Sequence, residues 1–203
     1  MSRAGLTPDR ITAAAADLAD RIGYDALTLS ALARELGVKT PSLYAHVAGL
    51  DGLRTDLTRL ALDELADRAA AALAGRSGRD ALHAFADTYR AYAHAHPGRY
   101  EAARAPVTPD SPDSPVIAAG RRNADLTRSV LRGYALAPAY EVHAIRLLGS
   151  LVHGFASLEL AGSFAHSAPA SDESWVAVLD ALDATLRGWP APLAAVAQAD
   201  SAL

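Results

Sequence analysis

The sequence predicts an all-α protein. Alanine and leucine dominate an apolar content of 51%, whereas aromatic residues make up 6% of the 203 residues. Alanine has the highest intrinsic helix propensity, and the runs of Val, Ile and Thr that favour strands are scarce. Apolar residues also recur at helical spacing in segments that Gly and Pro separate. We therefore expect about nine helices.

Caps, breakers and apolar spacing place these helices along the chain. The first should begin at Thr7, where a capping residue precedes a proline and an acid, and should end at Gly23. Further helices are expected at residues 28–36, 40–47, 51–74, 80–96, 99–104, 116–132, 140–160 and 173–189. Residues 106–115, rich in Pro, Ser and Asp, and residues 163–172 are expected to be surface loops.

Composition also narrows the class of protein. The chain has no cysteine, which excludes a disulfide framework and a thiolate metal site and agrees with a reducing cytoplasm. No segment reaches 18 consecutive apolar residues, and the N-terminal residues lack the apolar core of a signal peptide. We expect a soluble, cytoplasmic protein with no membrane partner.

The stretch from Thr28 to Val47 predicts a helix-turn-helix. Thr28 stands as an N-cap before a buried face, and Gly37 should end that helix because glycine takes the left-handed conformation without penalty. Thr40 and Pro41 should then cap and begin a second short helix. The buried face of the first helix comprises Leu29, Leu32, Ala33 and Leu36, at i, i+3, i+4 and i+7.

The outer face of the second helix suits a major groove of double-stranded DNA. Leu43 and Val47 should pack inward, leaving hydroxyls, a lysine, a tyrosine and a histidine outside to meet base edges and phosphates. Tyr44 is expected on a phosphate. The predicted DNA-binding residues are Thr28, Lys39, Thr40, Pro41, Ser42, Tyr44 and His46.

Residues 7 to 60 resemble the TetR family of bacterial transcription factors. The segment GYDALTLSALARELGVKTPSLYAHV, residues 23–47, follows the family's glycine-aromatic lead-in, capped helix, ALARELGV turn and recognition helix ending in Leu-Tyr-x-His-Val. The resemblance implies a homodimeric repressor that an unknown small-molecule effector releases from a palindromic operator. Where the family commonly has a lysine before the next helix, this chain has Leu50, so that phosphate contact falls to backbone amides or is lost.

The implied organisation is a three-helix head joined by a long helix to a helical body. We expect a helix-turn-helix DNA-binding domain at residues 1–50, a connector helix at 51–74, a ligand-binding and dimerisation domain at 75–190 and a disordered tail at 191–203. The apolar residues of helix 140–160 cover more than one face, which indicates packing against both its own core and a second subunit.

The stretch from Leu147 to Phe164 resembles the C-terminal domain of a TetR subgroup with a Trp-His-Gly motif. His153 and Gly154 match that motif, whereas Val152 replaces its tryptophan. The resemblance implies the domain type without a ligand. Candidate residues for lining a small-molecule cavity are Tyr89, Tyr92, Tyr100, His143, His153, Phe155 and Glu159, and for each the alternative is a core or interface residue.

Charge is a difficulty for DNA binding. The net charge is -4, and residues 1–60 carry seven basic against seven acidic residues. DNA binding therefore requires that the acids point away from DNA; these are Asp9, Asp17, Asp20 and Asp25. Arg3, on the N-terminal arm, reaches a phosphate or a minor groove in one reading and belongs to a solvated tail in the other.

No pattern calls for catalysis, a cofactor or a metal. The G-x-S-x-G elbow, the Walker loop and the dinucleotide fingerprint are missing, and His94 and His96 stand two residues apart, on different sides of a helix. Two alternatives stay open: an all-helical enzyme, and an all-α protein-interaction module without DNA binding. The second would show no salt-dependent binding to DNA.

Overall fold

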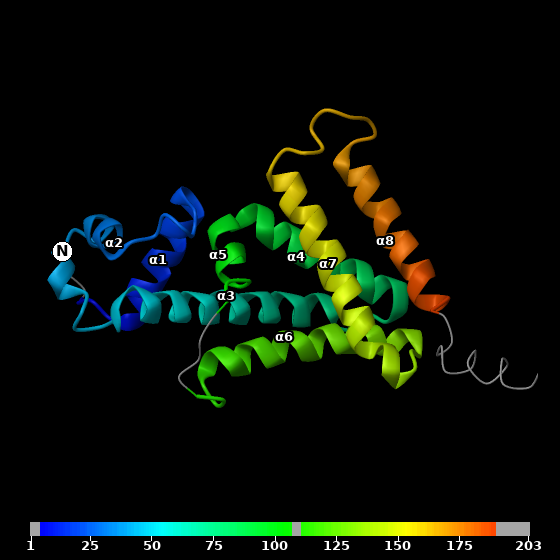
Figure 1. The fold of residues 1–203 in the computed structure, drawn as a ribbon, viewed down its shortest axis with the longest axis horizontal. Helices are drawn as coiled ribbons and strands as arrows, with labels where there is room; N and C mark the ends of the chain where they lie inside the picture. Colours follow the sequence, from blue (N-terminus) through cyan, green and yellow to red (C-terminus); the bar gives the residue numbers. More distant parts are fainter. Residues whose placement is uncertain (1–4, 107–110, 190–203) are drawn as a thin grey trace, which may run out of the picture. The chain divides into compact units, whose positions relative to one another are not determined.

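The chain folds into helices alone wherever the computed structural model describes it, at residues 5–106 and 111–189 (Figure 1). These residues form eight α-helices and three short 3-10 helices, which confirms the all-α prediction. The α-helices are α1 (Pro8–Ile22), α2 (Leu29–Glu35), α3 (Gly49–Leu73), α4 (Gly78–Ala95), α5 (Pro97–Ala102), α6 (Pro115–Leu131), α7 (Glu141–Leu160) and α8 (Ser171–Arg187). The 3-10 helices are η1 (Thr40–Ser42), η2 (Arg132–Tyr134) and η3 (Pro138–Tyr140). Arg3 and the predicted tail from residue 191 lie outside the described residues.

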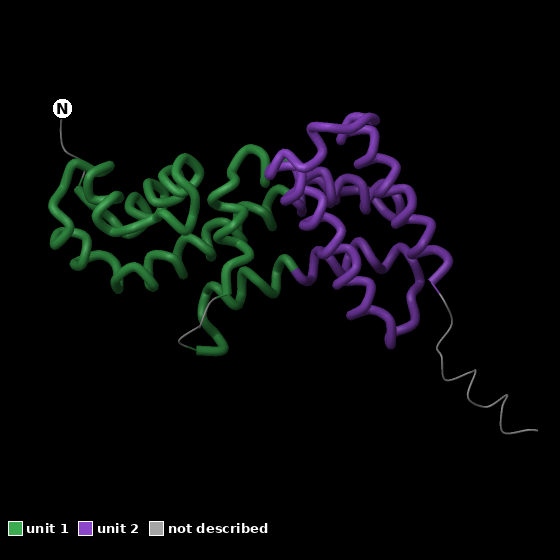
Figure 2. The backbone as a smooth tube through the Cα atoms, turned by 45° about the horizontal axis from the view of Figure 1, so that its top comes forward, with its two compact units in different colours: residues 1–68, 91–123 green, residues 69–90, 124–203 purple. Residues whose placement is uncertain are grey.

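The chain divides into two compact units (Figure 2). Unit 1 comprises residues 1–68 and 91–123, and unit 2 comprises residues 69–90 and 124–203. Because the helices α3, α4 and α6 each contribute residues to both units, this division follows packing and not function. The functional domains expected at residues 1–50, 51–74 and 75–190 therefore stay a prediction.

The first two helices of the head begin where the caps predict. The third does not: Thr40, predicted as a cap, is the first residue of η1, and the cap position, Lys39, makes no side-chain capping hydrogen bond. The Thr7 hydroxyl accepts a hydrogen bond from the backbone N–H of Arg10 at 3.3 Å, and the Thr28 hydroxyl accepts one from Ala31 at 3.1 Å. The core of unit 1 then joins α1, α2, the segment after α2 and α3. Its fully buried large side chains include Ile11, Leu27, Leu32, Leu43, Leu53 and Leu57. Each buried leucine of this kind stabilises the fold by about 1.5–3 kcal/mol.

Helix α5 packs directly on α1. Sequence reasoning took Pro97 and Gly98 as the end of a helix, whereas the structure begins α5 at Pro97, after a break at His96 alone. Gly98 is buried, and a Cβ atom there would lie 2.2 Å from the carbonyl carbon and oxygen of Ala19. The absence of a side chain at Gly98 is therefore what lets the two helices approach.

Unit 2 packs its own core from segments of α4 and α6 with α7 and α8. Its buried side chains include Leu82, Leu148, Leu179 and Leu186. Two aromatic residues also donate hydrogen bonds to carboxylates: Trp175 Nε1 to Asp87 at 2.7 Å, and the Tyr134 hydroxyl to Asp183 at 2.8 Å. Each polar tip in this core is thereby satisfied.

Candidate nucleic-acid interface

The predicted DNA-binding residues gather on one short stretch of the head. We call residues 39–46 the recognition segment. It follows α2 through Gly37, whose φ of +67° glycine adopts without strain, and the Val38 N–H closes the turn on the Ala33 carbonyl at 2.9 Å.

The recognition segment is not the α-helix that the sequence predicted. The Leu43 N–H donates to the Thr40 carbonyl at 3.0 Å and the His46 N–H to the Leu43 carbonyl at 2.9 Å, both three-residue spacings. Only the η1 turn, Thr40–Ser42, is regular, and hydrogen-bonded turns follow it. Gly49, at a φ of +73°, then begins α3.

Buried anchors fix the recognition segment to the head and leave its outer side free. Leu43 is fully buried and Val47 is 7% exposed, as predicted, whereas Tyr44 is 61% exposed. Lys39, Pro41 and Ser42 are exposed, and Thr40 and His46 are half-buried. Within the described part of the chain, no side-chain hydrogen bond or ion pair occupies Lys39, Ser42 or Tyr44. Thr28 is exposed, but its hydroxyl caps α2.

Two of the four head acids that DNA binding requires to point away from DNA, Asp17 and Asp20, contact α5 and its cap. Asp20 Oδ1 accepts the backbone N–H of Arg99 at 2.9 Å, and its Oδ2 lies 3.1 Å from His96 Nδ1. The Asp17 carboxylate pairs with the Arg99 guanidinium. Among the other charges of the head, Arg21 pairs with Glu35 at 2.7 Å. The negative charge of the α1 surface next to α5 is thus partly offset by Arg99.

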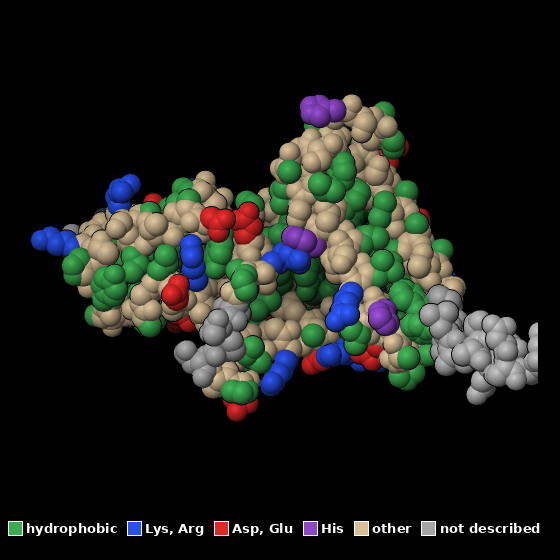
Figure 3. Space-filling model, viewed as in Figure 1, with side chains coloured by type: hydrophobic (Ala, Val, Ile, Leu, Met, Phe, Trp, Pro, Cys, Tyr) green, Lys and Arg blue, Asp and Glu red, His purple; other side chains and the backbone are tan. Residues whose placement is uncertain are grey.

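The surface charge of the head stays modest. On the face drawn in Figure 3, Lys and Arg side chains lie in several separate places, some with Asp or Glu side chains beside them, and they form no continuous basic stripe on that face. A protein that binds DNA mainly through phosphates needs a basic stripe. The described head therefore suits recognition by a few directed contacts.

The seven residues predicted to line a ligand cavity belong to different units. Tyr92 and Tyr100 lie in unit 1, and the other five lie in unit 2. Tyr92 is fully buried, donates its hydroxyl proton to Glu64 at 2.7 Å and has the Arg68 guanidinium 4.8 Å from its ring centre. Burial, and then the hydrogen bond to Glu64, raise the pKa of Tyr92 above its usual range. Burial likewise raises the pKa of Tyr100.

The five residues in unit 2 have varied surroundings. Glu159 is 9% exposed and accepts two hydrogen bonds from Arg90, from Nε at 2.7 Å and from NH2 at 2.5 Å. Phe155 packs 4.9 Å from the Trp175 ring. His153 lies 3.2 Å from the Ser157 hydroxyl, Tyr89 is half-buried beside Phe85, and His143 is exposed. Their role in ligand binding stays a prediction.

Arg90 and Asp172 were not predicted as site residues, although Arg90 holds Glu159 and Asp172 together. The Arg90 guanidinium also lies 5.3 Å from the centre of the Trp175 ring. The hydrogen bonds to Glu159 are the largest cause of a raised Arg90 pKa. Glu159 and Asp172 lie 69 and 82 residues after Arg90 in the chain, so no local sequence pattern predicts these contacts.

Among the described residues, no helix combines the length and the apolar character needed to span a bilayer. The same residues contain no group of three His, Cys, Asp or Glu side chains placed to hold a metal ion.

Both the N-terminal and the C-terminal part of the chain resemble known proteins. A sequence model for bacterial regulatory proteins of the tetR family matches residues 11–49, and a model for the tetracyclin repressor-like C-terminal domain matches residues 82–182. The uncharacterized HTH-type transcriptional regulator Rv0681 of Mycobacterium tuberculosis is 39% identical over 160 residues, which cover 78% of this chain and 72% of that protein. The uncharacterized HTH-type transcriptional regulator YobS of Bacillus subtilis is 34% identical over 156 residues, covering 77% and 80%.

A solved structure shares the fold. The TetR family protein ActR of Streptomyces coelicolor, in complex with (S)-DNPA, superposes with a TM-score of 0.64 and 23% identity over 91% of this chain and 98% of that one. The two sequence relatives and the head geometry agree with this likeness. The chain belongs to the TetR family of transcriptional regulators and carries their DNA-binding N-terminal domain.

Proposed function

We propose that this regulator is a homodimeric repressor that reads a palindromic operator with the recognition segment and leaves it when a small molecule binds. The observation that carries the proposal is the anchoring of that segment. Leu43 and Val47 are held in the core while Lys39, Ser42 and Tyr44 stay exposed beside them. Free donors on a fixed support can meet base edges with little further ordering.

The residues of the recognition segment take different roles in this proposal. Lys39, Ser42, Thr40 and His46 contact bases or phosphates, and Tyr44 donates its hydroxyl proton to a phosphate. Pro41 fixes the backbone of η1 by its ring. Thr28 supports the segment from the neighbouring helix, because its cap sets the start of α2.

Dimerisation uses the outer face of α7 in this proposal. Val142, Gly149, His153 and Leu160 are spaced i, i+7, i+11 and i+18, which aligns them in one stripe. Val142 is 53% and Leu160 40% exposed, and a Cβ added at Gly149 would meet open space. A two-fold contact on this stripe would set two heads on successive major grooves, about 34 Å apart.

A substitution at Gly149 tests this contact. Gly149→Arg places a charge in the stripe and should give a monomer in analytical ultracentrifugation. Gly120→Arg, at another open helical glycine in unit 1, should leave the dimer intact. A monomeric wild-type protein, or a dimer that survives Gly149→Arg, would contradict the assigned face.

The ligand response rests on family likeness and on polar groups inside the helices. ActR is described in complex with a small molecule. In this chain, His153 and Gly154 match two of three positions of the Trp-His-Gly motif, and we assign the C-terminal part to that subgroup. A ligand bound in the C-terminal part would lower operator affinity only if it binds the free and the DNA-bound states unequally.

Selection of bound sequences from random DNA tests the function itself. We expect an imperfect palindrome whose half-sites lie one helical turn apart. Tyr44→Phe should weaken binding to all sequences similarly, whereas Lys39→Ala or Ser42→Ala should relax the sequence preference by about 1–3 kcal/mol per base contact. Unchanged binding in all three variants would refute the recognition segment, and the lack of any salt-dependent binding would favour a protein-interaction module.

A further inference from the structure

His96 stands where α1, α3 and α5 of unit 1 come together (Figure 1). It is the one residue between α4, which ends at Ala95, and α5, which begins at Pro97. Its ring Nδ1 lies 3.1 Å from Oδ2 of Asp20 in α1, and its Nε2 lies 3.2 Å from a terminal guanidinium nitrogen of Arg68 in α3. The side chain is 24% exposed. One imidazole ring therefore joins the first helix of the head to α3.

The partners of His96 decide which ring nitrogen carries the proton. A carboxylate only accepts hydrogen bonds and a guanidinium only donates them, so Asp20 requires an N–H at Nδ1 whereas Arg68 requires a lone pair at Nε2. The neutral ring with its proton on Nδ1 is the one form that makes both bonds. The Arg99 guanidinium also lies 3.0 Å from Nδ1. It has acceptors elsewhere, because Arg99 pairs with both Asp17 and Asp20.

A second proton on His96 opposes two of these contacts. It would place an N–H at Nε2 against the N–H groups of Arg68. The ring would also become a cation 3.2 Å from one guanidinium and 3.0 Å from another. The attraction to Asp20 would grow, but this carboxylate already accepts the backbone N–H of Arg99 at 2.9 Å. Two cations in direct contact outweigh one shared anion, so the site fits the neutral ring.

The remaining ionisable groups around the ring are engaged with other partners. Glu64 of α3 accepts the hydroxyl proton of Tyr92 at 2.7 Å and lies 3.9 Å from the Arg99 guanidinium. The Asp17 carboxylate pairs with Arg99. The Tyr92 ring of α4 packs against the His96 ring, with 5.2 Å between the ring centres. Asp20 is therefore the carboxylate that contacts His96 among the described residues.

We propose that His96 is a proton-sensitive link between α1 and α3, intact in its neutral form and broken by protonation. The inner face of α1 shares the core of unit 1 with Leu43 and Val47, the anchors of the recognition segment. Protonation would therefore loosen the support of the DNA-binding side chains. Histidine in water gains its proton at about pH 6.5, within the range that cells reach. The link requires neither the dimer nor the effector proposed above, and each can fail without the other.

The position of the proton can be read from the 15N NMR shifts of the His96 ring in the full-length protein. At about pH 8, where a free imidazole is neutral, we expect a protonated Nδ1 and an unprotonated Nε2. The His96→Asn variant identifies the signal because it removes it. A ring that carries its proton on Nε2, on both nitrogens or equally on either would overturn the proposal.

Hydrogen exchange of the Arg99 amide measures the link itself, because that N–H donates to Asp20. After correction for the intrinsic exchange rate, its protection should fall about tenfold or more between about pH 7.5 and about pH 5.5, a range in which histidine gains a proton while carboxylates stay charged. This dependence on pH should disappear in His96→Asn. His166→Asn, at an exposed histidine in unit 2, is the matched control and should behave like the wild-type protein.

Two results would contradict the proton link. One is equal protection of the Arg99 amide at both pH values in the wild-type protein. The other is the same dependence on pH in a folded His96→Asn variant. If His96→Asn does not fold, the wild-type comparison still decides. Neither measurement uses DNA, so failure of the link and failure of the proposed operator recognition are distinguishable.

Discussion

Gly98→Ala should separate α5 from α1 and destabilise the protein. The added Cβ would lie 2.2 Å from two backbone atoms of Ala19 and 2.6 Å from the backbone nitrogen of Asp20, where an ordinary contact needs 3.4–4 Å. Because these are backbone atoms, no side-chain rotation relieves the overlap. The two helices must move apart by more than an ångström.

Two hydrogen bonds would lengthen with that movement. The Arg99 N–H donates to Asp20 at 2.9 Å and joins α5 to α1, and the Tyr24 N–H donates to Glu101 at 3.2 Å and joins α5 to the segment after α1. Overpacking costs about 1–3 kcal/mol, and each charged hydrogen bond contributes about 1.5–3 kcal/mol. The higher helix propensity of alanine offsets about 0.5–1 kcal/mol of this loss in stability. The free energy of unfolding should therefore fall by about 2 kcal/mol or more.

Urea denaturation followed by circular dichroism measures this change, at one protein concentration because any self-association would affect apparent stability. Gly120→Ala is the matched control: it makes the same substitution within a helix of unit 1, where an added Cβ meets nothing within 4 Å. It should raise stability by about 0.5–1 kcal/mol. If Gly98→Ala is as stable as Gly120→Ala, α5 does not pack on α1 in this way.

Unit 2 offers three further tests. Glu159→Gln leaves the Arg90 guanidinium, 18% exposed, with one less charged partner and should lower the free energy of unfolding by about 3 kcal/mol; a loss below half of that would contradict the buried pair. Tyr134→Phe removes the hydrogen bond to Asp183 and should lower it by about 1 kcal/mol in the same urea assay. The hydrogen bond from Arg187 lowers the pKa of Asp183 despite burial, with a further contribution from Tyr134. The stabilisation is therefore present above the unfolded-state pKa, about 3.9, and is lost as pH falls through the folded-state value. Asp183→Asn should flatten the stability profile in that acid range, and an unchanged profile would refute this linkage.

Local signals were enough to predict the helices of the head. Thr7 and Thr28 accept the capping hydrogen bonds that their positions imply, and Gly37 has the left-handed conformation expected of a helix stop. These features depend on neighbours three or four residues away, which a sequence displays directly. The recognition segment was predicted less well: Thr40 and Pro41 mark a helical start but do not decide between 3-10 and α hydrogen bonding.

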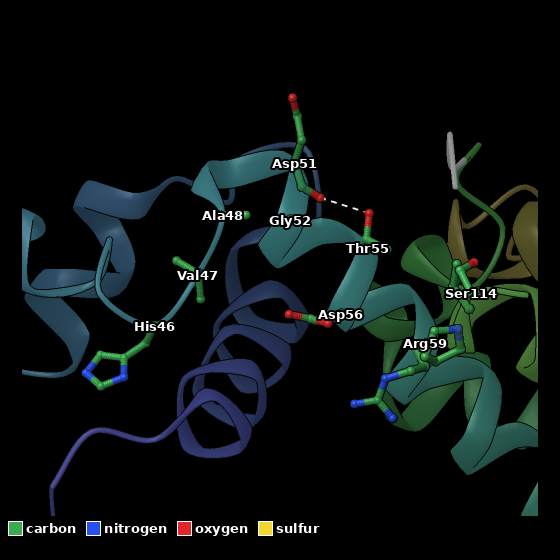
Figure 4. A pocket seen from close by; sticks show the side chains of 11 residues that line it. His46, Val47, Ala48, Asp51, Gly52, Thr55, Asp56, Arg59 and Ser114 are labelled. Carbon is green, nitrogen blue, oxygen red and sulfur yellow. Dashed lines mark hydrogen bonds between the residues drawn. The ribbon is translucent and has the colours of Figure 1, made fainter. Parts of the chain in front are cut away.

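Long-range contacts explain what sequence reasoning could not reach. Pro97 and Gly98 predict a helix end, and α4 does end at Ala95, but the same pair also begins α5. The close approach of Ala19, 79 residues earlier in the chain, is what requires glycine at position 98. Arg90 was not predicted for the same reason, because its role comes from its hydrogen bonds to Glu159 and Asp172, which lie far away in the sequence. A surface groove lined by residues 46–59 and 114–116 likewise depends on segments far apart in the sequence (Figure 4).

Part of the negative charge of the head is offset by a residue outside the head. Residues 1–60 contain as many acids as bases, which opposes binding to a polyanion. The Arg99 guanidinium pairs with both Asp17 and Asp20, so one positive charge from α5 partly offsets two negative charges without using a basic residue of the head. Lys39 keeps its charge free of any partner among the described residues. Helix α5 therefore does two things for the head: it fixes α1 in place through Gly98, and it reduces the electrostatic cost of bringing α1 near phosphates.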